Sequence, residues 1–95
     1  MPENIMNAPH GMNLVIECKD GSAVIGRFDE SNGFEVTMHD IDLWNPDQGD
    51  PDAREQWVRQ TATYGVAVKQ RDYRFPASNV AQWRSLGDVE RLPLG

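Results

Sequence analysis

Apolar and polar residues alternate over three segments in the first half of the chain. In residues 12–19 one face is apolar, with Val15 as the exception, and its members are Leu14, Ile16 and Cys18. In residues 23–29 the apolar face holds Val24 and Phe28, and in residues 34–41 it holds Phe34, Val36, Met38 and Ile41. A period of two is typical of a strand with one buried face, so the pattern predicts three strands.

Glycines lie between these predicted strands and inside one of them. Asp20-Gly21 and Asn32-Gly33 lie between the predicted strands, and such pairs favour tight hairpin turns because glycine adopts positive φ at little cost. Gly26 lies inside the second strand, where a glycine indicates a sharp bend or a close approach of two backbones. The first half of the chain is therefore predicted to be a bent three-stranded meander.

The second half is less regular. Residues 40–55 hold six acids and one arginine, a net charge of −5, and their prolines and glycine predict a loop. Alternating apolar residues then predict a long strand over residues 58–69, with a bend at Gly65. Residues 79–83 fit a last short strand or a single helical turn, and we favour the strand. The tail, residues 87–95, is expected to be loose.

Composition narrows the function classes. A length of 95 residues fits one domain, 1–95, with a core at about 12–84, and a net charge of −6 argues against a protein that coats nucleic acid electrostatically. The lone Cys18 excludes an internal disulfide, and no Cys/His cluster has zinc spacing. We find no signal peptide and no apolar stretch long enough for a membrane span, so we expect a soluble, cytoplasmic protein without membrane contact.

Catalytic and metal chemistry find little support in the sequence. Cys18 lies on an apolar face without a partner His or Asn at a recognisable spacing, so it fits a small buried hydrophobe better than a nucleophile. His10 and His39 fall at polar positions and are expected to be solvated. The acidic segment lacks the alternating carboxylates of a calcium loop. We therefore expect no catalytic residue, no metal and no cofactor.

The stretch KDGSAVIG resembles the first signature of the Sm and Sm-like (LSm/Hfq-type) family. The matching residues are Lys19, Asp20, Gly21, Val24 and Gly26, followed downstream by Phe28 and Phe34. The resemblance implies an all-β, five-stranded, strongly bent SH3-like barrel, with room for a short N-terminal helical turn. Residues 69–74 and 79–83 would be its last two strands, and residues 42–57 an expanded version of the variable acidic loop.

The same resemblance implies the mode of assembly. Family members pair the fourth strand of one subunit with the fifth strand of the next, which gives a homo-oligomeric ring of about five to eight subunits. The expected partner is therefore the chain itself, in a non-catalytic assembly.

The RNA site of the family is only partly matched. Gly33 and Glu35 stand where RNA-binding members have a stacking side chain and an asparagine, and Arg74 is followed by Phe75 in place of a glycine. A carboxylate repels phosphate and lacks an amide's donors. Two alternatives stay open: weak binding of single-stranded RNA, or a structural or protein-interaction module that has lost the base pocket. The candidate RNA-binding residues are Lys69, Arg71, Tyr73, Arg74 and Asn32.

Overall fold

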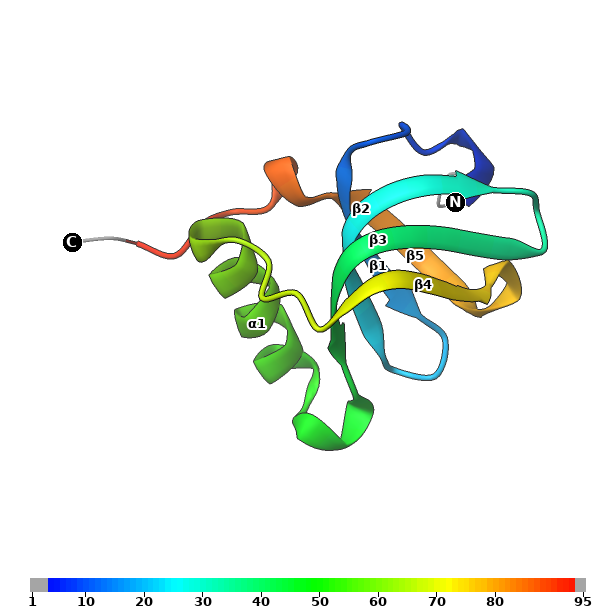
Figure 1. Ribbon diagram of the computed structural model, residues 1–95. Coiled ribbons are helices and arrows are strands. Elements are labelled where there is room, and N and C mark those ends of the chain that lie inside the picture. The colour runs from blue at the N-terminus through cyan, green and yellow to red at the C-terminus, as the bar shows by residue number, and fades with distance from the viewer. Residues whose placement is uncertain (1–3, 94–95) are drawn as a thin grey trace.

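The computed structural model describes residues 4–93, which form one antiparallel five-stranded sheet and one α-helix (Figure 1). The strands are β1 (Asn13–Cys18), β2 (Ala23–Ser31), β3 (Glu35–Trp44), β4 (Gln70–Pro76) and β5 (Val80–Ser85). Helix α1 spans Pro51–Tyr64, and short 3-10 turns cover Ile5–Asn7, Pro46–Gln48, Ala77–Asn79 and Leu86–Asp88. The sheet order is β4-β3-β2-β1-β5, so β4 and β5 form the edges. The meander, the last two strands and the N-terminal helical turn are thus confirmed, in a protein that is mostly β.

The β1–β2 hairpin turns at the predicted residues. Gly21 has φ +91°, a conformation that glycine adopts readily. The Asp20 carboxylate accepts hydrogen bonds from the Ser22 backbone N–H at 2.9 Å and from the Ser22 hydroxyl at 2.6 Å. These bonds lower the pKa of Asp20, the hydroxyl contributing most. The Lys-Asp-Gly turn is therefore fixed by local chemistry.

Gly26 marks a bulge between β2 and β3. Ile25 pairs with Asp42 and Arg27 with His39, so two residues of β3 lie opposite the single Gly26. A Cβ atom at Gly26 would lie only 2.3 Å from Ile41 Cγ2, which leaves no room for a side chain. The close backbone approach predicted for this glycine is confirmed.

The inner face of the curved sheet carries the main core. Leu14, Ile16, Val36 and Met38 are completely buried there, as their alternation predicted. Cys18 belongs to the same cluster, and burial raises the pKa of its thiol. The remaining buried members are Ile5, Ala8, Val24, Phe28, Ile41 and Phe75.

The prediction for residues 42–69 was wrong. The supposed acidic loop, 42–57, contains the end of β3 and the first half of α1, and the supposed strand over 58–69 is the rest of α1 followed by an extended connection. Asp50 caps the helix by accepting a hydrogen bond from the Ala53 N–H at 2.8 Å, and Pro51 occupies the first turn, where its missing N–H costs nothing. Gly65, at φ +98°, ends the helix.

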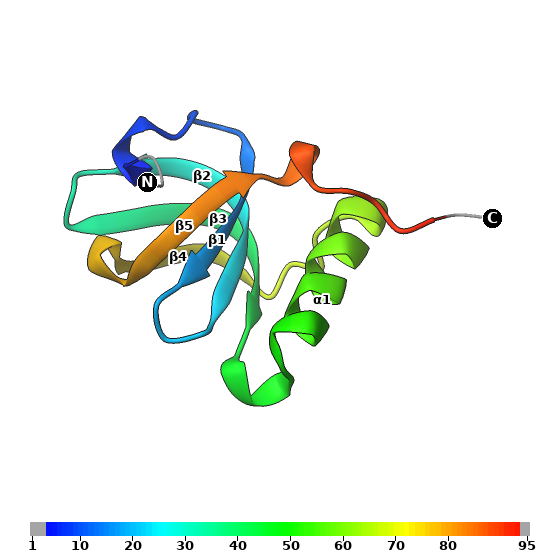
Figure 2. The same ribbon diagram turned by 180° about the vertical axis from the view of Figure 1, so that it is seen from behind.

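Helix α1 covers a second core on the outer face of the sheet, beside the C-terminal segment (Figure 2). Val58 is buried against Val15 and Ile25, which explains why Val15 breaks the alternation of β1. Leu86 and Val89 complete this cluster. The tail predicted to be loose from residue 87 therefore packs at Val89, and its Leu92 N–H donates to Thr63 Oγ1 at 2.9 Å. Residues 94–95 of that prediction lie outside the described residues.

A buried carboxylate joins α1 to the sheet. Asp42 at the end of β3 is buried, and its Oδ2 accepts a hydrogen bond from the Trp57 indole N–H at 3.1 Å. Its Oδ1 lies 2.9 Å from Lys69 Nζ and accepts from the Leu43 N–H at 2.8 Å. A buried carboxylate is stable only when it is paired and hydrogen-bonded, and these three donors satisfy it. They position α1 and the start of β4 against the same end of β3.

Candidate functional site: the polar face of β2, β3 and β4

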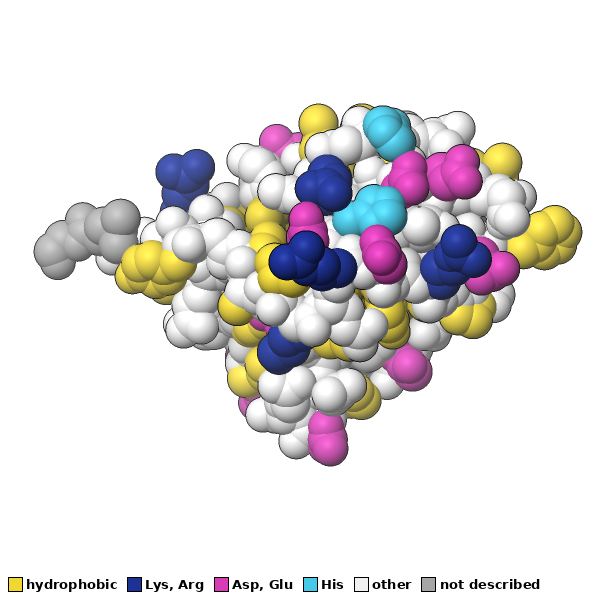
Figure 3. Space-filling model, viewed as in Figure 1, with side chains coloured by type: hydrophobic (Ala, Val, Ile, Leu, Met, Phe, Trp, Pro, Cys, Tyr) yellow, Lys and Arg dark blue, Asp and Glu magenta, His cyan; other side chains and the backbone are white. Residues whose placement is uncertain are grey.

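The outward faces of β2, β3 and β4 carry a continuous polar surface. Acidic, basic and histidine side chains are mixed across this side of the molecule, and both histidines of the chain lie on it (Figure 3). Two hollows open on this surface, one at the hairpin end of the strands and one around His39. We consider it the candidate site because it combines these hollows with a network of charged side chains that joins the three strands.

His39 lies at the centre of this surface. Its Nδ1 is 2.8 Å from Asp72 Oδ1 on β4, and its Nε2 is 2.9 Å from Asp29 Oδ2 on β2. The hydrogen bond to Asp29, followed by that to Asp72, raises the pKa of His39. His39 was expected to be solvated, but its side chain is only 28% exposed and is held on both sides.

Other charges nearby are also paired. The Arg27 guanidinium lies 3.2 Å from the carboxylate of Asp40, a residue in the bulge with φ +50°. His10 of the N-terminal arm is largely exposed, as predicted, and its Nδ1 lies 2.6 Å from the Asp29 backbone carbonyl. This part of the surface is thus a network of opposite charges.

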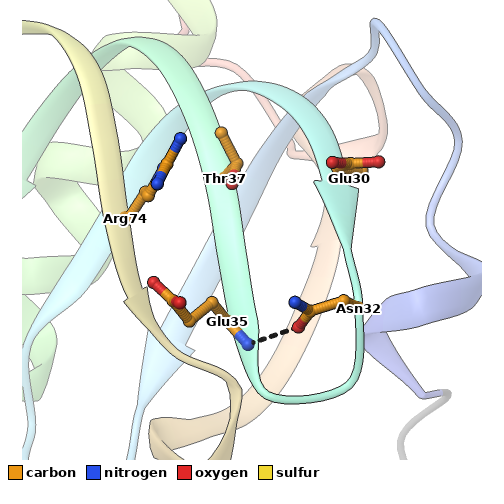
Figure 4. Close-up of a pocket in the computed structure, with 5 residues that line it drawn as sticks. All are labelled: Glu30, Asn32, Glu35, Thr37 and Arg74. Carbon is orange, nitrogen blue, oxygen red and sulfur yellow. Dashed lines mark hydrogen bonds between the residues drawn. The ribbon is translucent and has the colours of Figure 1, made fainter.

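The hollow at the hairpin end encloses about 170 Å³. Its lining residues are Glu30, Asn32, Glu35, Thr37 and Arg74. Figure 4 shows Arg74 on the β4 side of the hollow and Glu30 on the β2 side, with Thr37 between them on β3. Two carboxylates and one guanidinium give the lining a net negative charge, which does not favour a phosphate group.

Asn32 also has a structural role at this hollow. Its side-chain Oδ1 accepts hydrogen bonds from the backbone N–H groups of Phe34 and Glu35, both at 2.9 Å, the second of which is drawn in Figure 4. Asn32 therefore stabilises the β2–β3 turn, and its carbonyl oxygen is already engaged.

The structure brings only part of the predicted RNA-binding set together. Asn32 and Arg74 line the same hollow, whereas Lys69 is paired with the buried Asp42. Tyr73 points to the core side and packs on Phe75 with ring centroids 5.6 Å apart, and burial raises the pKa of its hydroxyl. Arg71 and Tyr73 are two residues apart and share one face of β4, whereas Arg74 lies on the other face. The two arginines therefore point to different sides of the strand.

Most family-signature positions have clear structural roles, with one correction. Lys19, Asp20 and Gly21 form the hairpin turn, Val24 and Phe28 are core residues, and Gly26 forms the bulge. Phe34, expected in the apolar run of β3, is instead 82% exposed. The Asn32 cap and Gly33 at φ +91° extend the turn through Phe34, so β3 begins only at Glu35.

The partners of His39 were missed from the sequence. In the sequence, Asp29 and Asp72 look like ordinary surface acids. Only the register of β3 with β4 shows that Asp72 lies directly opposite His39. Within residues 4–93, the structure has no cluster of three or more His, Cys, Asp or Glu side chains that could hold a metal ion. Over the same residues, no helix is long and apolar enough to cross a bilayer.

Comparison with known proteins assigns no family. No protein-family model matches the chain, and no curated protein is significantly similar to it.

Proposed function

We propose that this protein is a non-catalytic module of the Sm-like type that assembles with copies of itself through the two edges of its sheet. The observation that supports this proposal is the strand order, in which β4 and β5 each pair with one neighbour among the described residues. An unpaired edge presents backbone N–H and C=O groups that can pair with another strand. Each subunit thus offers two complementary edges.

Pairing β4 of one subunit with β5 of the next satisfies both edges. A symmetric pairing of two β4 strands would close a dimer and leave both β5 edges unpaired, whereas head-to-tail pairing repeats around a ring until no edge remains. We therefore favour a closed homo-oligomer, with about five to eight subunits as the Sm-like resemblance implies.

The β4 ladder identifies the residues that would face the neighbour. The Ala77 N–H donates to the Phe34 carbonyl at 2.8 Å, and hydrogen bonds alternate along an antiparallel pair. Successive N–H groups of β4 therefore point alternately toward β3 and away from it. Arg74 pairs with Thr37 and precedes Ala77 by three residues, an odd number, so its N–H faces away from β3. A proline at position 74 would remove an edge donor without removing a bond of the β3–β4 ladder.

The test compares Arg74→Pro with Arg74→Ala by light scattering coupled to size-exclusion chromatography. Wild-type protein and Arg74→Ala should be oligomers at micromolar concentration, whereas Arg74→Pro should dissociate while it keeps its circular dichroism spectrum. A folded wild-type monomer would refute the proposal, and so would an Arg74→Pro oligomer of unchanged size. A dimer would instead favour the symmetric pairing and contradict the ring.

A second candidate function, binding of single-stranded RNA, is favoured by one observation at the hairpin end. Phe34 is 82% exposed at the β2–β3 tip, and Arg74 lines the adjoining hollow. An exposed aromatic ring can stack on any base, worth about 1–3 kcal/mol per base, and a guanidinium can contact phosphate. The carboxylates of Glu30 and Glu35 repel the phosphates of the RNA backbone, so RNA binding should be weak and strongly dependent on salt.

Fluorescence anisotropy with labelled poly-U, poly-A and a mixed oligonucleotide at about 50 mM salt tests this second function. Phe34→Leu, which keeps the apolar bulk without a ring, should weaken binding nearly as much as Phe34→Ala, because both remove the ring that stacks on a base. Arg74→Ala should weaken binding to all sequences about equally, Arg71→Ala on the other face of β4 should weaken it less, and Glu35→Asn should strengthen it. Undetectable binding by the wild type would remove RNA as a ligand and leave the self-assembling module, which the light-scattering experiment tests separately.

A further inference from the structure

The two hydrogen bonds of His39 require two ring protons. Nδ1 lies 2.8 Å from Asp72 Oδ1 and Nε2 lies 2.9 Å from Asp29 Oδ2. An ionised carboxylate only accepts, and a neutral imidazole carries one N–H, so a neutral ring could donate to just one of them. The imidazolium form is the one that satisfies both contacts. We call His39, Asp29 and Asp72 the His39 clasp.

The charged groups in direct contact with the His39 ring favour its protonated form. Asp29 approaches from β2 and Asp72 from β4, and both are acidic. Arg27 lies directly opposite His39 on β2, but it is paired with Asp40 of β3. His10 of the N-terminal arm contacts Asp29 on its other oxygen, at 3.2 Å. Further out, Glu30 and Arg74 line the same hollow as His39.

The clasp connects an edge strand to the interior of the sheet. Among the described residues β4 pairs along its length only with β3, and the clasp ties it through His39 to β2 as well. The Asp72 side chain is 84% exposed and that of Asp29 is 32% exposed. Water can replace the hydrogen bond to Asp72 more easily than the one to Asp29. A neutral His39 ring, which carries one N–H, should therefore keep its hydrogen bond to Asp29 and lose the one to Asp72.

We propose that the His39 clasp is a proton-dependent contact that stabilises the attachment of β4 to the sheet when His39 is protonated and weakens this attachment when His39 is neutral. Because the pKa of His39 is raised by its carboxylate partners, the clasp contributes fully below the pKa of the unfolded state, about 6.5. That contribution is lost as the pH rises through the higher pKa of the folded state. The proposal concerns a contact within one chain and does not depend on self-assembly or RNA.

The first test is NMR titration of the wild-type protein with 15N-labelled histidine. At pH 6 both ring nitrogens of His39 should be protonated in most molecules, and its midpoint should lie above that of the same protein unfolded in urea. Asp72→Asn should lower the midpoint, because it replaces a carboxylate by a neutral amide on an exposed side chain. His10→Gln, a matched change on the other side of Asp29, should alter the midpoint less. A His39 midpoint at or below the unfolded value, or no change in Asp72→Asn, would overturn the proposal.

The second test is hydrogen exchange between pH 6 and pH 8.5, corrected for the intrinsic exchange rate. The β4 amides should lose about two- to fivefold in protection over this range, the effect of one exposed ion pair, while the β1–β2 hairpin changes less. In His39→Gln, whose side chain does not titrate, the difference between β4 and the hairpin should be independent of pH. Equal pH dependence of β4 in the wild type and His39→Gln would show that His39 does not control this strand.

Discussion

Replacement of Gly26 by alanine tests the close contact at the β2–β3 bulge. An added Cβ would lie 2.3 Å from Ile41 Cγ2, 2.9 Å from Ile41 Cα and 3.0 Å from the His39 carbonyl oxygen. A rotamer change could move the first atom, but the other two belong to the backbone of β3. The strands would have to separate in the bulge, where pairing is already irregular.

The expected cost follows from these contacts. Overpacking in a well-packed interior costs about 1–3 kcal/mol, and two backbone clashes place Gly26→Ala at the upper end. The alanine also restricts the unfolded chain, which offsets about 0.4–1 kcal/mol. We therefore expect a net loss of about 2–2.5 kcal/mol in the free energy of unfolding, or a melting temperature lower by about 10–20 °C.

Urea unfolding followed by tryptophan fluorescence measures this loss, since the chain has three tryptophans. Gly87→Ala is the matched control, because a Cβ there would lie 3.6 Å from Ser85 Oγ, an ordinary contact, and should change stability by less than about 0.5 kcal/mol. Ile41→Ala added to Gly26→Ala removes the Cγ2 clash but not the backbone clashes, so it should not restore stability. A loss below about 1 kcal/mol in Gly26→Ala, or rescue by Ile41→Ala, would refute the reasoning.

Two further predictions concern the attachment of α1, and both use the same unfolding assay. Val58→Ala should cost about 2 kcal/mol, because Val58 is buried under the outer face of the sheet, whereas the exposed Gln60→Ala should be nearly neutral. A neutral Val58→Ala would mean that α1 does not pack as described. Trp57→Phe should cost about 1–3 kcal/mol because it removes the indole donor from the buried Asp42. Wild-type stability in that variant would show that the carboxylate does not need the indole.

The first half of the fold could be predicted because its signals are local. The Asp20-Gly21 turn, the glycine in β2 and the alternation of β1 each reflect the conformation of a few neighbouring residues. Helix α1 was missed for a physical reason. Val58 and Ala62 are four residues apart, a spacing that fits one face of a helix as well as alternate positions of a strand.

Two signals for the helix were nevertheless in the sequence. Asp50 followed by Pro51 is a typical helix start, and the apolar Val15 on the polar face of β1 indicated a second packed layer. The site was harder to predict. The His39 clasp joins residues 29, 39 and 72 through strand register, and the exposure of Phe34 depends on where a turn ends. Such features follow from tertiary geometry and leave no periodic trace.

The position of β1 in the sheet has a consequence for the synthesis of the protein on the ribosome. This strand is buried on both faces, and it pairs with β2 on one side and β5 on the other, where Leu14 lies opposite Ser85. The hairpin can form early, but the second partner of β1 emerges only after α1 and β4. Until then β1 is an apolar strand with an open edge, the kind of segment that promotes aggregation. Nascent chains stalled before residue 80 should therefore depend on chaperones, and chains that have released β5 should not.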